Sequence, residues 1–142
     1  GNPFIDRKSP VEPVASLTAP IIQVRTIEQA GTIGYAASFA VPAGAVIATV
    51  ALGYADGYLR ALGNAGVASV AGVHVPVVGR ISMDLLTLDV SAAPAGAVAE
   101  GTYVELFGRD VSIDDVAKAA GTISYELLTS IGRRVKREYF QA

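Results

Sequence analysis

The hydrophobic positions of this chain fall mostly into short runs of strand length, which are rich in β-branched residues and bounded by Gly or Pro. Such runs predict strands within residues 20–27, 45–52, 67–90 and 103–107. The second run, AVIATVAL, is apolar throughout, which is typical of a strand buried on both faces. The third run is broken at Pro76 and Gly79, so we expect more than one strand within it.

Helical signals appear only near the C-terminal end of the sequence. Ser112 is a residue type that caps helices and Gly121 is a stop signal, so a short helix is predicted between them. A second helix is predicted to start with Thr122 or Ser124 as its cap and to run to Gly132. The tail that follows, RRVKREYF, alternates apolar and charged residues and is expected to form a last strand.

Together these elements predict a mainly β domain, a Greek-key-like β-barrel with two short helices near the C-terminus. Residues 1–18 carry three of the seven prolines and show no clear period, so they are expected to form a linker or lead-in. The β-domain itself is expected over residues 19–142, an ordinary length for one domain.

The composition narrows the function classes. The 142 residues include no Cys, which excludes disulfides and thiolate sites, and a single His, which argues against a zinc site built on imidazoles. A net charge of −2 without a basic stripe gives nucleic-acid binding no electrostatic support. No apolar run approaches the ~20 residues of a membrane span, and the N-terminus lacks a signal-peptide pattern. We therefore expect a cytoplasmic protein with no metal, nucleic-acid or membrane partner.

No self-contained catalytic set is visible in the sequence. His74 lies in VHVPVV, an apolar strand-like setting in which a structural histidine is the more frequent case. Asp114 and Asp115 form a carboxylate pair, but the first turn of a helix explains them without chemistry. No segment fits the G-x-G-x-x-G fingerprint followed by a long helix, so no dinucleotide site is expected.

The unusual feature is a glycine before each of Tyr35, Tyr54 and Tyr58. Small neighbours let a backbone approach a ligand closely, but they also form bends and bulges in a curved sheet. Residue types alone favour the bulge, because the ordinary pKa of a tyrosine is about 10 and an unperturbed phenol is a poor base.

Four segments taken together resemble the C-terminal domain of alanine racemases. They are GYAASF (34–39), ALGYADGYLR (51–60), VVGRISMD (77–84) and TISYE (122–126), in the order and close to the spacing of that family. GYADGY followed by GRISMD is a specific pair, and the resemblance covers nearly the whole chain from about residue 15.

The resemblance implies a fold-type III pyridoxal-phosphate enzyme, in which an N-terminal α/β barrel precedes this β-domain. In that family the active site forms between the barrel of one subunit and the β-domain of its partner in a homodimer. The implied reaction interconverts L- and D-alanine by a two-base mechanism on a pyridoxal-phosphate aldimine, with the cofactor as electron sink. The resemblance leaves open whether the D-alanine serves as a peptidoglycan precursor or the enzyme degrades alanine.

The family's site residues carry over by position. Tyr35 matches the tyrosine base, and Met83 matches the residue whose backbone N–H meets the substrate carboxylate, although its side chain can still be core packing. Tyr54 matches a tyrosine of the inner gate beside the substrate. Tyr125 matches the tyrosine that hydrogen-bonds the cofactor phosphate, here near a helix start, where anions are favoured.

Arg60, Arg80 and Ile123 match positions of the outer corridor that leads to the active site, and a purely structural role is equally open for them. Asp84 follows Met83 in the motif and is assigned no role.

The α/β barrel and its cofactor lysine have no counterpart in this sequence, because Lys8, Lys118 and Lys136 match no lysine of the family. The chain alone is therefore expected to be inactive. Two other functions stay open: a racemase for another or a broader set of amino acids, and a non-catalytic β-barrel interaction module of shared ancestry.

Overall fold

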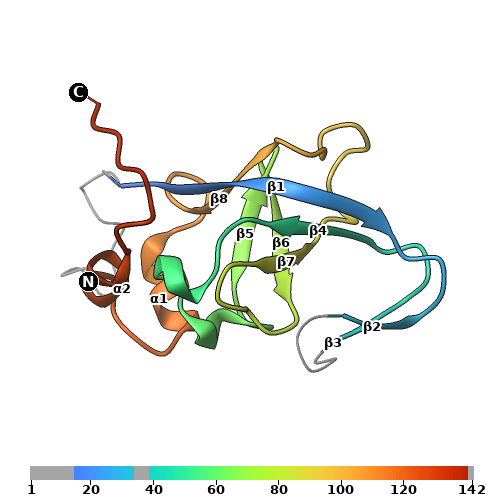
Figure 1. Ribbon diagram of the computed structural model, residues 1–142, viewed down its shortest axis with the longest axis horizontal. Coiled ribbons are helices and arrows are strands. Elements are labelled where there is room, and N and C mark those ends of the chain that lie inside the picture. The colour runs from blue at the N-terminus through green and yellow to red at the C-terminus, as the bar shows by residue number, and fades with distance from the viewer. Residues whose placement is uncertain (1–14, 34–38, 141–142) are drawn as a thin grey trace.

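The computed structural model describes residues 15–33 and 39–140, and these form a mainly β domain (Figure 1). Six strands close into a barrel in the order β1-β4-β7-β6-β5-β8, with every pairing antiparallel. They are β1 (Leu17–Thr26), β4 (Val46–Val50), β5 (Val67–Val70), β6 (Val73–Val78), β7 (Leu86–Asp89) and β8 (Tyr103–Phe107). The run β8-β5-β6-β7 is a Greek key, because the strand that follows the β5-β6-β7 meander returns beside its first member. The predicted fold class is confirmed.

A hairpin of β2 (Gly31–Ile33) and β3 (Phe39–Val41) forms a separate two-stranded sheet. It lies at the end of the molecule opposite the two helices (Figure 1). The segment that joins the two strands, residues 34–38, lies outside the described residues. The hairpin is tied to the barrel by apolar packing, since Ile33 and Val41 cluster with Ile47 and Val78 of barrel strands.

Strand β4 is buried on both faces, as its apolar run predicts. Ile47 and Ala48 are neighbours in sequence, so their side chains point to opposite faces of the sheet, and both are fully buried. Ala48 belongs to the barrel core, whereas Ile47 belongs to the small cluster under the hairpin. A strand that packs against two cores has no polar face. This explains why apolar and polar residues do not alternate along β4.

The predicted break at Pro76 is wrong, whereas the break at Gly79 is confirmed. Strand β6 continues through Pro76, which pairs with Val67 of β5. The N–H of Val77 points toward β5 and donates to the Gly66 oxygen at 2.9 Å. The ring nitrogen of Pro76 therefore points the other way, where pairing with β7 begins only at Val77. A proline without an N–H is tolerated at such an unpaired position.

Two α-helices and two 3₁₀ turns cover one end of the barrel. They are α1 (Ile113–Ala119), α2 (Ser124–Ser130), η2 (Tyr54–Asp56) and η3 (Arg60–Leu62). Ser112 caps α1 as predicted, because its hydroxyl accepts the Asp114 N–H at 3.2 Å. The cap of α2 differs from the prediction: it is Ile123, whose side chain cannot accept a hydrogen bond, and Ser124 is already helical and buried.

The tail after α2 forms no strand, so this prediction is wrong. Every barrel strand already has two neighbours, so the barrel has no open edge that the alternating tail could join. The tail instead turns on itself, since the Arg137 guanidinium donates to the carbonyl oxygens of Ile131, Gly132 and Val135 at 2.9, 3.1 and 3.2 Å. At the other end of the chain, β1 starts at Leu17, two residues inside the predicted lead-in.

In the part of the chain that the structure describes, no helix is both long and apolar enough to cross a bilayer.

Candidate functional site

Two of the family-matched segments are held together backbone to backbone. The 3₁₀ turn η2 lies against the loop after β6, where the Tyr54 N–H donates to the Ser82 oxygen at 3.1 Å and the Ala55 N–H donates to the Met83 oxygen at 3.0 Å. Gly53 makes this approach feasible, because a Cβ there would collide with the carbonyl oxygens of Ser82 and Met83. The glycine before Tyr54 is thus a point of close backbone contact and no sheet bulge.

Met83 and Asp84 occupy the middle of a tight turn. The Ser82 N–H donates to the Leu85 oxygen at 3.0 Å, and the Leu85 N–H donates back to the Ser82 hydroxyl at 3.1 Å. Met83 is 53% exposed as a residue, so it is not part of the core. Among the described residues, none accepts a hydrogen bond from the Met83 N–H. The turn therefore presents a main-chain donor that is available to an anion.

The two tyrosines of GYADGY have opposite environments. The Tyr54 side chain is 43% exposed beside the turn, whereas Tyr58 is buried in the barrel core. Burial raises the pKa of the Tyr58 phenol far above its ordinary value, so this hydroxyl stays protonated. The Tyr58 hydroxyl also has no hydrogen-bond partner among the described residues. Tyr54 is the candidate for contact with a ligand, and Tyr58 is a packing residue.

Helix α2 presents the two matched residues of TISYE at the surface. Tyr125 is 64% exposed near the start of the helix, and the preceding cap residue Ile123 is exposed as well. The other end of α2 is anchored beside η2, where the Ser130 hydroxyl donates to the Gly57 oxygen at 3.0 Å. Gly57 has a φ of +102° and no room for a Cβ against the Ser130 carbonyl, so glycine is required there.

The two matched arginines come from neighbouring segments. Arg60 begins η3, and the Gly63 that caps this turn lies against the backbone of residues 79–81 that carries Arg80. The Asn64 side chain accepts the Gly79 N–H at 2.6 Å and joins the same two segments. Both arginines are exposed, and neither forms an ion pair with a described residue.

An ion-pair network that sequence reasoning missed lies next to Tyr54 and Met83. Arg134 of the tail contacts the carboxylate of Asp56 through Nε at 3.2 Å and that of Asp84 through Nη2 at 2.7 Å. The second oxygen of Asp56, Oδ2, accepts the Gly53 N–H at 3.0 Å. The hydrogen bond with Asp84 and the charge of Asp56 raise the pKa of Arg134 above its ordinary value. The only sequence signals were an acidic residue inside a glycine-rich motif and a basic tail.

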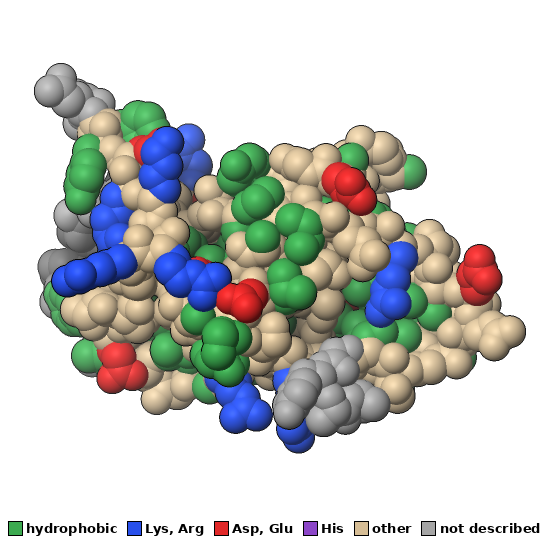
Figure 2. Space-filling view, in the orientation of Figure 1, with side chains coloured by type: hydrophobic (Ala, Val, Ile, Leu, Met, Phe, Trp, Pro, Cys, Tyr) green, Lys and Arg blue, Asp and Glu red, His purple; other side chains and the backbone are tan. Residues whose placement is uncertain are grey.

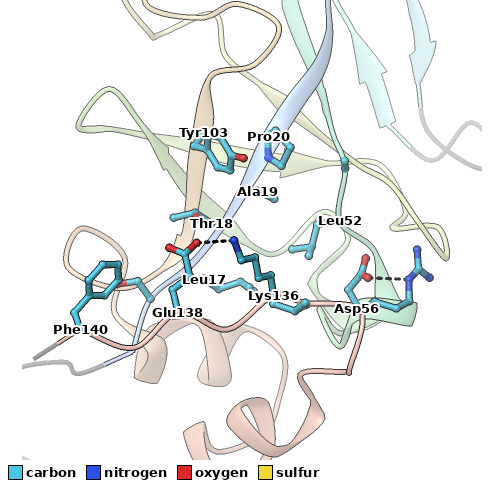
Figure 3. Close-up of a pocket in the computed structure, with 14 residues that line it drawn as sticks. Leu17, Thr18, Ala19, Pro20, Leu52, Asp56, Tyr103, Lys136, Glu138 and Phe140 are labelled. Carbon is cyan, nitrogen blue, oxygen red and sulfur yellow. Dashed lines mark ion pairs between the residues drawn. The ribbon is translucent and has the colours of Figure 1, made fainter.

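The same tail borders a hollow of about 560 Å³ along the start of β1 (Figure 3). Asp56 points into it beside its ion pair with the tail, and Lys136 and Glu138 form an exposed ion pair at 3.1 Å across from Leu17 and Thr18. Basic side chains gather on this side of the molecule (Figure 2). The hollow is not lined by Tyr54, Met83 or Tyr125, although Ala51, Leu52 and Asp56 of the matched segment ALGYADGYLR line it.

Three candidates from the sequence remain: His74, a metal site and Tyr35. His74 is exposed on β6 with its Nε2 2.8 Å from the Asp110 backbone oxygen, an arrangement that fits the structural interpretation. Among residues 15–33 and 39–140, no three His, Asp or Glu side chains gather as a metal site. Tyr35 lies outside the described residues, although β2 and β3 on either side of its segment are described.

Comparison with known proteins supplies the context for these residues. The sequence model of one family, described as "Alanine racemase, C-terminal domain", matches residues 14–139. An alanine racemase of Rhodospirillum rubrum is 47% identical over 139 residues, which cover 98% of this chain and 37% of that protein. The chain thus spans little more than a third of this relative.

Solved structures agree with the sequence match. The biosynthetic alanine racemase from Pseudomonas aeruginosa superposes with a TM-score of 0.90 at 37% identity, over 99% of this chain and 40% of that one. Alanine racemase from Bartonella henselae, solved with covalently bound pyridoxal phosphate, superposes with a TM-score of 0.83 at 36% identity, over 88% of this chain and 34% of that one.

Proposed function

Since this chain belongs to the alanine racemase family, as its C-terminal domain, we propose that it completes the active site of a pyridoxal-phosphate enzyme that interconverts L- and D-alanine. The observation that carries the proposal is that the turn at Ser82–Leu85 is hydrogen-bonded to η2. It places an exposed tyrosine, Tyr54, beside the Met83 N–H, which has no acceptor among the described residues. A main-chain donor next to an exposed phenol suits a small amino acid with a carboxylate.

The chain's own groups fit the cofactor only as part of a shared site. Lys118 is exposed on α1 and Lys136 is paired with Glu138 in the tail, so neither faces Tyr54 or Met83 in a pocket. The exposed phenol of Tyr125 has no hydrogen-bond partner among the described residues and can donate to a phosphate, and the start of α2 beside it has no side-chain cap. Pyridoxal phosphate, when bound, supplies the electron sink that makes the substrate Cα–H acidic.

In this proposal each residue has one task. The Met83 N–H binds the substrate carboxylate, Tyr54 limits the space beside it, and Tyr125 donates to the cofactor phosphate. Tyr35 removes and returns a proton on one face of the substrate. A phenol with an ordinary pKa of about 10 needs a positive neighbour for that task.

The partners follow from the exposed surface and the coverage of relatives. The large apolar or aromatic residues at the matched positions are each exposed on this domain: Tyr54, Met83, Ile123 and Tyr125. We propose that the N-terminal barrel of a second subunit covers them in a homodimer, and that the chain's own barrel packs elsewhere on the domain. We also propose that this enzyme works in the cytoplasm, as expected from the sequence.

The proposal is tested with the full-length protein that contains this chain and with Tyr35→Phe. The parent enzyme should racemise alanine, and the variant should lose activity by orders of magnitude while still binding pyridoxal phosphate, because one of the two bases is gone. Racemisation is followed by circular dichroism and cofactor binding by absorbance. Unchanged turnover from both enantiomers would show that Tyr35 is not the base, and a parent enzyme inactive on alanine would reject the substrate.

A further inference from the structure

We propose that Arg134 is a positioning residue. By bridging Asp56 and Asp84, it holds Tyr54 and the Met83 N–H in a fixed position relative to each other. The effect on catalysis rests on the function proposed above, whereas the effect on the loops does not.

Each carboxylate that Arg134 contacts belongs to one of the two segments that form the candidate site. Asp56 lies at the end of η2, two residues after Tyr54, and it also accepts the Gly53 N–H at 3.0 Å. Asp84 follows Met83 directly in the tight turn, and its Oδ1 lies 2.7 Å from the guanidinium. One cation therefore joins the two segments from the side, in addition to their two backbone hydrogen bonds.

The geometry requires an arginine. Nε points to Asp56 and Nη2 to Asp84, so two donors of one planar group serve two separate carboxylates. A lysine ammonium is a single point of charge and lacks this fixed fork. Arg134 and Asp84 are about half exposed, and ion pairs that face water add little to global stability. We therefore expect the Arg134 ion pairs to keep the Ser82–Leu85 turn ordered, with little effect on the stability of the whole domain.

Contacts other than the Arg134 guanidinium also hold the tail. The Gly132 N–H donates to the Asp56 backbone oxygen at 2.9 Å, and Arg137 holds the carbonyl oxygens of Ile131 and Val135. Val135 also packs against the barrel core. A substitution of the Arg134 side chain should therefore release the two carboxylates and leave the fold intact.

The test uses the full-length holoenzyme with Arg134→Gln. Arg133→Gln is the matched control, since Arg133 is the exposed neighbour and contacts no described residue through a hydrogen bond or ion pair. In R134Q, residues 53–56 should exchange amide hydrogen for deuterium about tenfold faster than in R133Q, because the Tyr54 and Ala55 amides lose support. The peptides that cover β5 and β8, which lie away from the turn, should exchange as in the parent.

Kinetics provide the second measurement. We expect kcat/KM for L-alanine to fall by about 10- to 100-fold in R134Q, mainly through KM, because the displaced Met83 N–H serves ground-state binding. Arg134→Lys should recover part of the loss, and D84N/R134Q should be no worse than R134Q if the two residues act together.

Exchange and kinetics in R134Q that match R133Q would overturn the proposal. Faster exchange throughout the barrel in R134Q would also overturn it, since the residue would then support the fold in general. If the parent enzyme does not racemise alanine, the proposed function fails by itself, and the exchange of residues 53–56 still decides the role of Arg134.

Discussion

The barrel wall and the cluster of η2, the Ser82–Leu85 turn and the tail are held by different forces. In the wall, antiparallel ladders carry side chains such as Leu88 and Leu106 that are completely buried. In the cluster, segments meet through backbone hydrogen bonds, a glycine with no room for a Cβ, and an exposed cation between two carboxylates. Burial determines the stability of the domain, whereas polar contacts at the surface place the residues that face a ligand.

The largest effect should come from the wall. Leu88→Ala is expected to lower the free energy of unfolding by about 2–5 kcal/mol, because it leaves a cavity in the core. Met83→Ala is the matched change in the cluster and should stay within about 0.5 kcal/mol, because that side chain is exposed. Urea denaturation of the domain measures both. A similar loss for both variants would contradict the division between the two regions.

A smaller effect is expected where the two loops of the cluster meet. Gly53→Ala should cost about 1–3 kcal/mol, because the added methyl must displace the carbonyl oxygens of Ser82 and Met83. In the full-length enzyme it should also raise KM for L-alanine. Gly31→Ala is the control, since a Cβ there would meet only one atom, the Gln29 oxygen at 3.9 Å. Equal stability and KM for the two variants would show that the close contact has no role.

The smallest effect concerns the pH dependence of the two tyrosines of GYADGY. Burial raises the pKa of Tyr58 above that in the unfolded chain, so the folded state keeps a proton that the unfolded state loses. The contribution of Tyr58 to the free energy of unfolding should be constant below pH ~10. Above that pH, the free energy of unfolding should fall by about 1.4 kcal/mol per pH unit.

Tyr58→Phe should flatten this slope and leave stability at neutral pH unchanged or higher by about 1 kcal/mol, because the buried hydroxyl has no partner among the described residues. Tyr54→Phe, at the exposed position, should keep the slope. Denaturation between pH 9 and 11 distinguishes the two, and a slope retained in Tyr58→Phe would contradict the assignment.

Much of the fold follows from local patterns in the sequence. The apolar run at residues 45–52 predicts a doubly buried strand, and β4 serves two cores. YVELF matches β8 residue for residue, and Ser112 caps α1 as its side chain allows. These features depend on neighbours in sequence, and the physics of strand alternation and of helix ends acts over the same short range.

The family-matched residues that the structure describes were also identifiable from the sequence, because three short segments carry them, ALGYADGYLR, VVGRISMD and TISYE. Their roles stay predictions, and Tyr35 lies outside the described residues. What the motifs did not reveal is why GYADGY and GRISMD occur together. Their backbones hydrogen-bond to each other, and the glycine before Tyr54 makes that approach sterically feasible.

The sequence by itself therefore determined most barrel strands and the capped helix, and it supplied the candidate site residues, whose roles stay predictions. Only the tertiary structure decided the conformation of the tail. Its alternation of apolar and charged residues predicts a strand, but the closed barrel has no open edge with which such a strand could pair. The tertiary structure also decided the partners of Arg134, because Asp56 and Asp84 lie far from it in the chain and the barrel brings all three together. Local patterns reflect interactions between sequence neighbours, whereas a closed sheet and a bridging cation depend on contacts made only after the chain has folded.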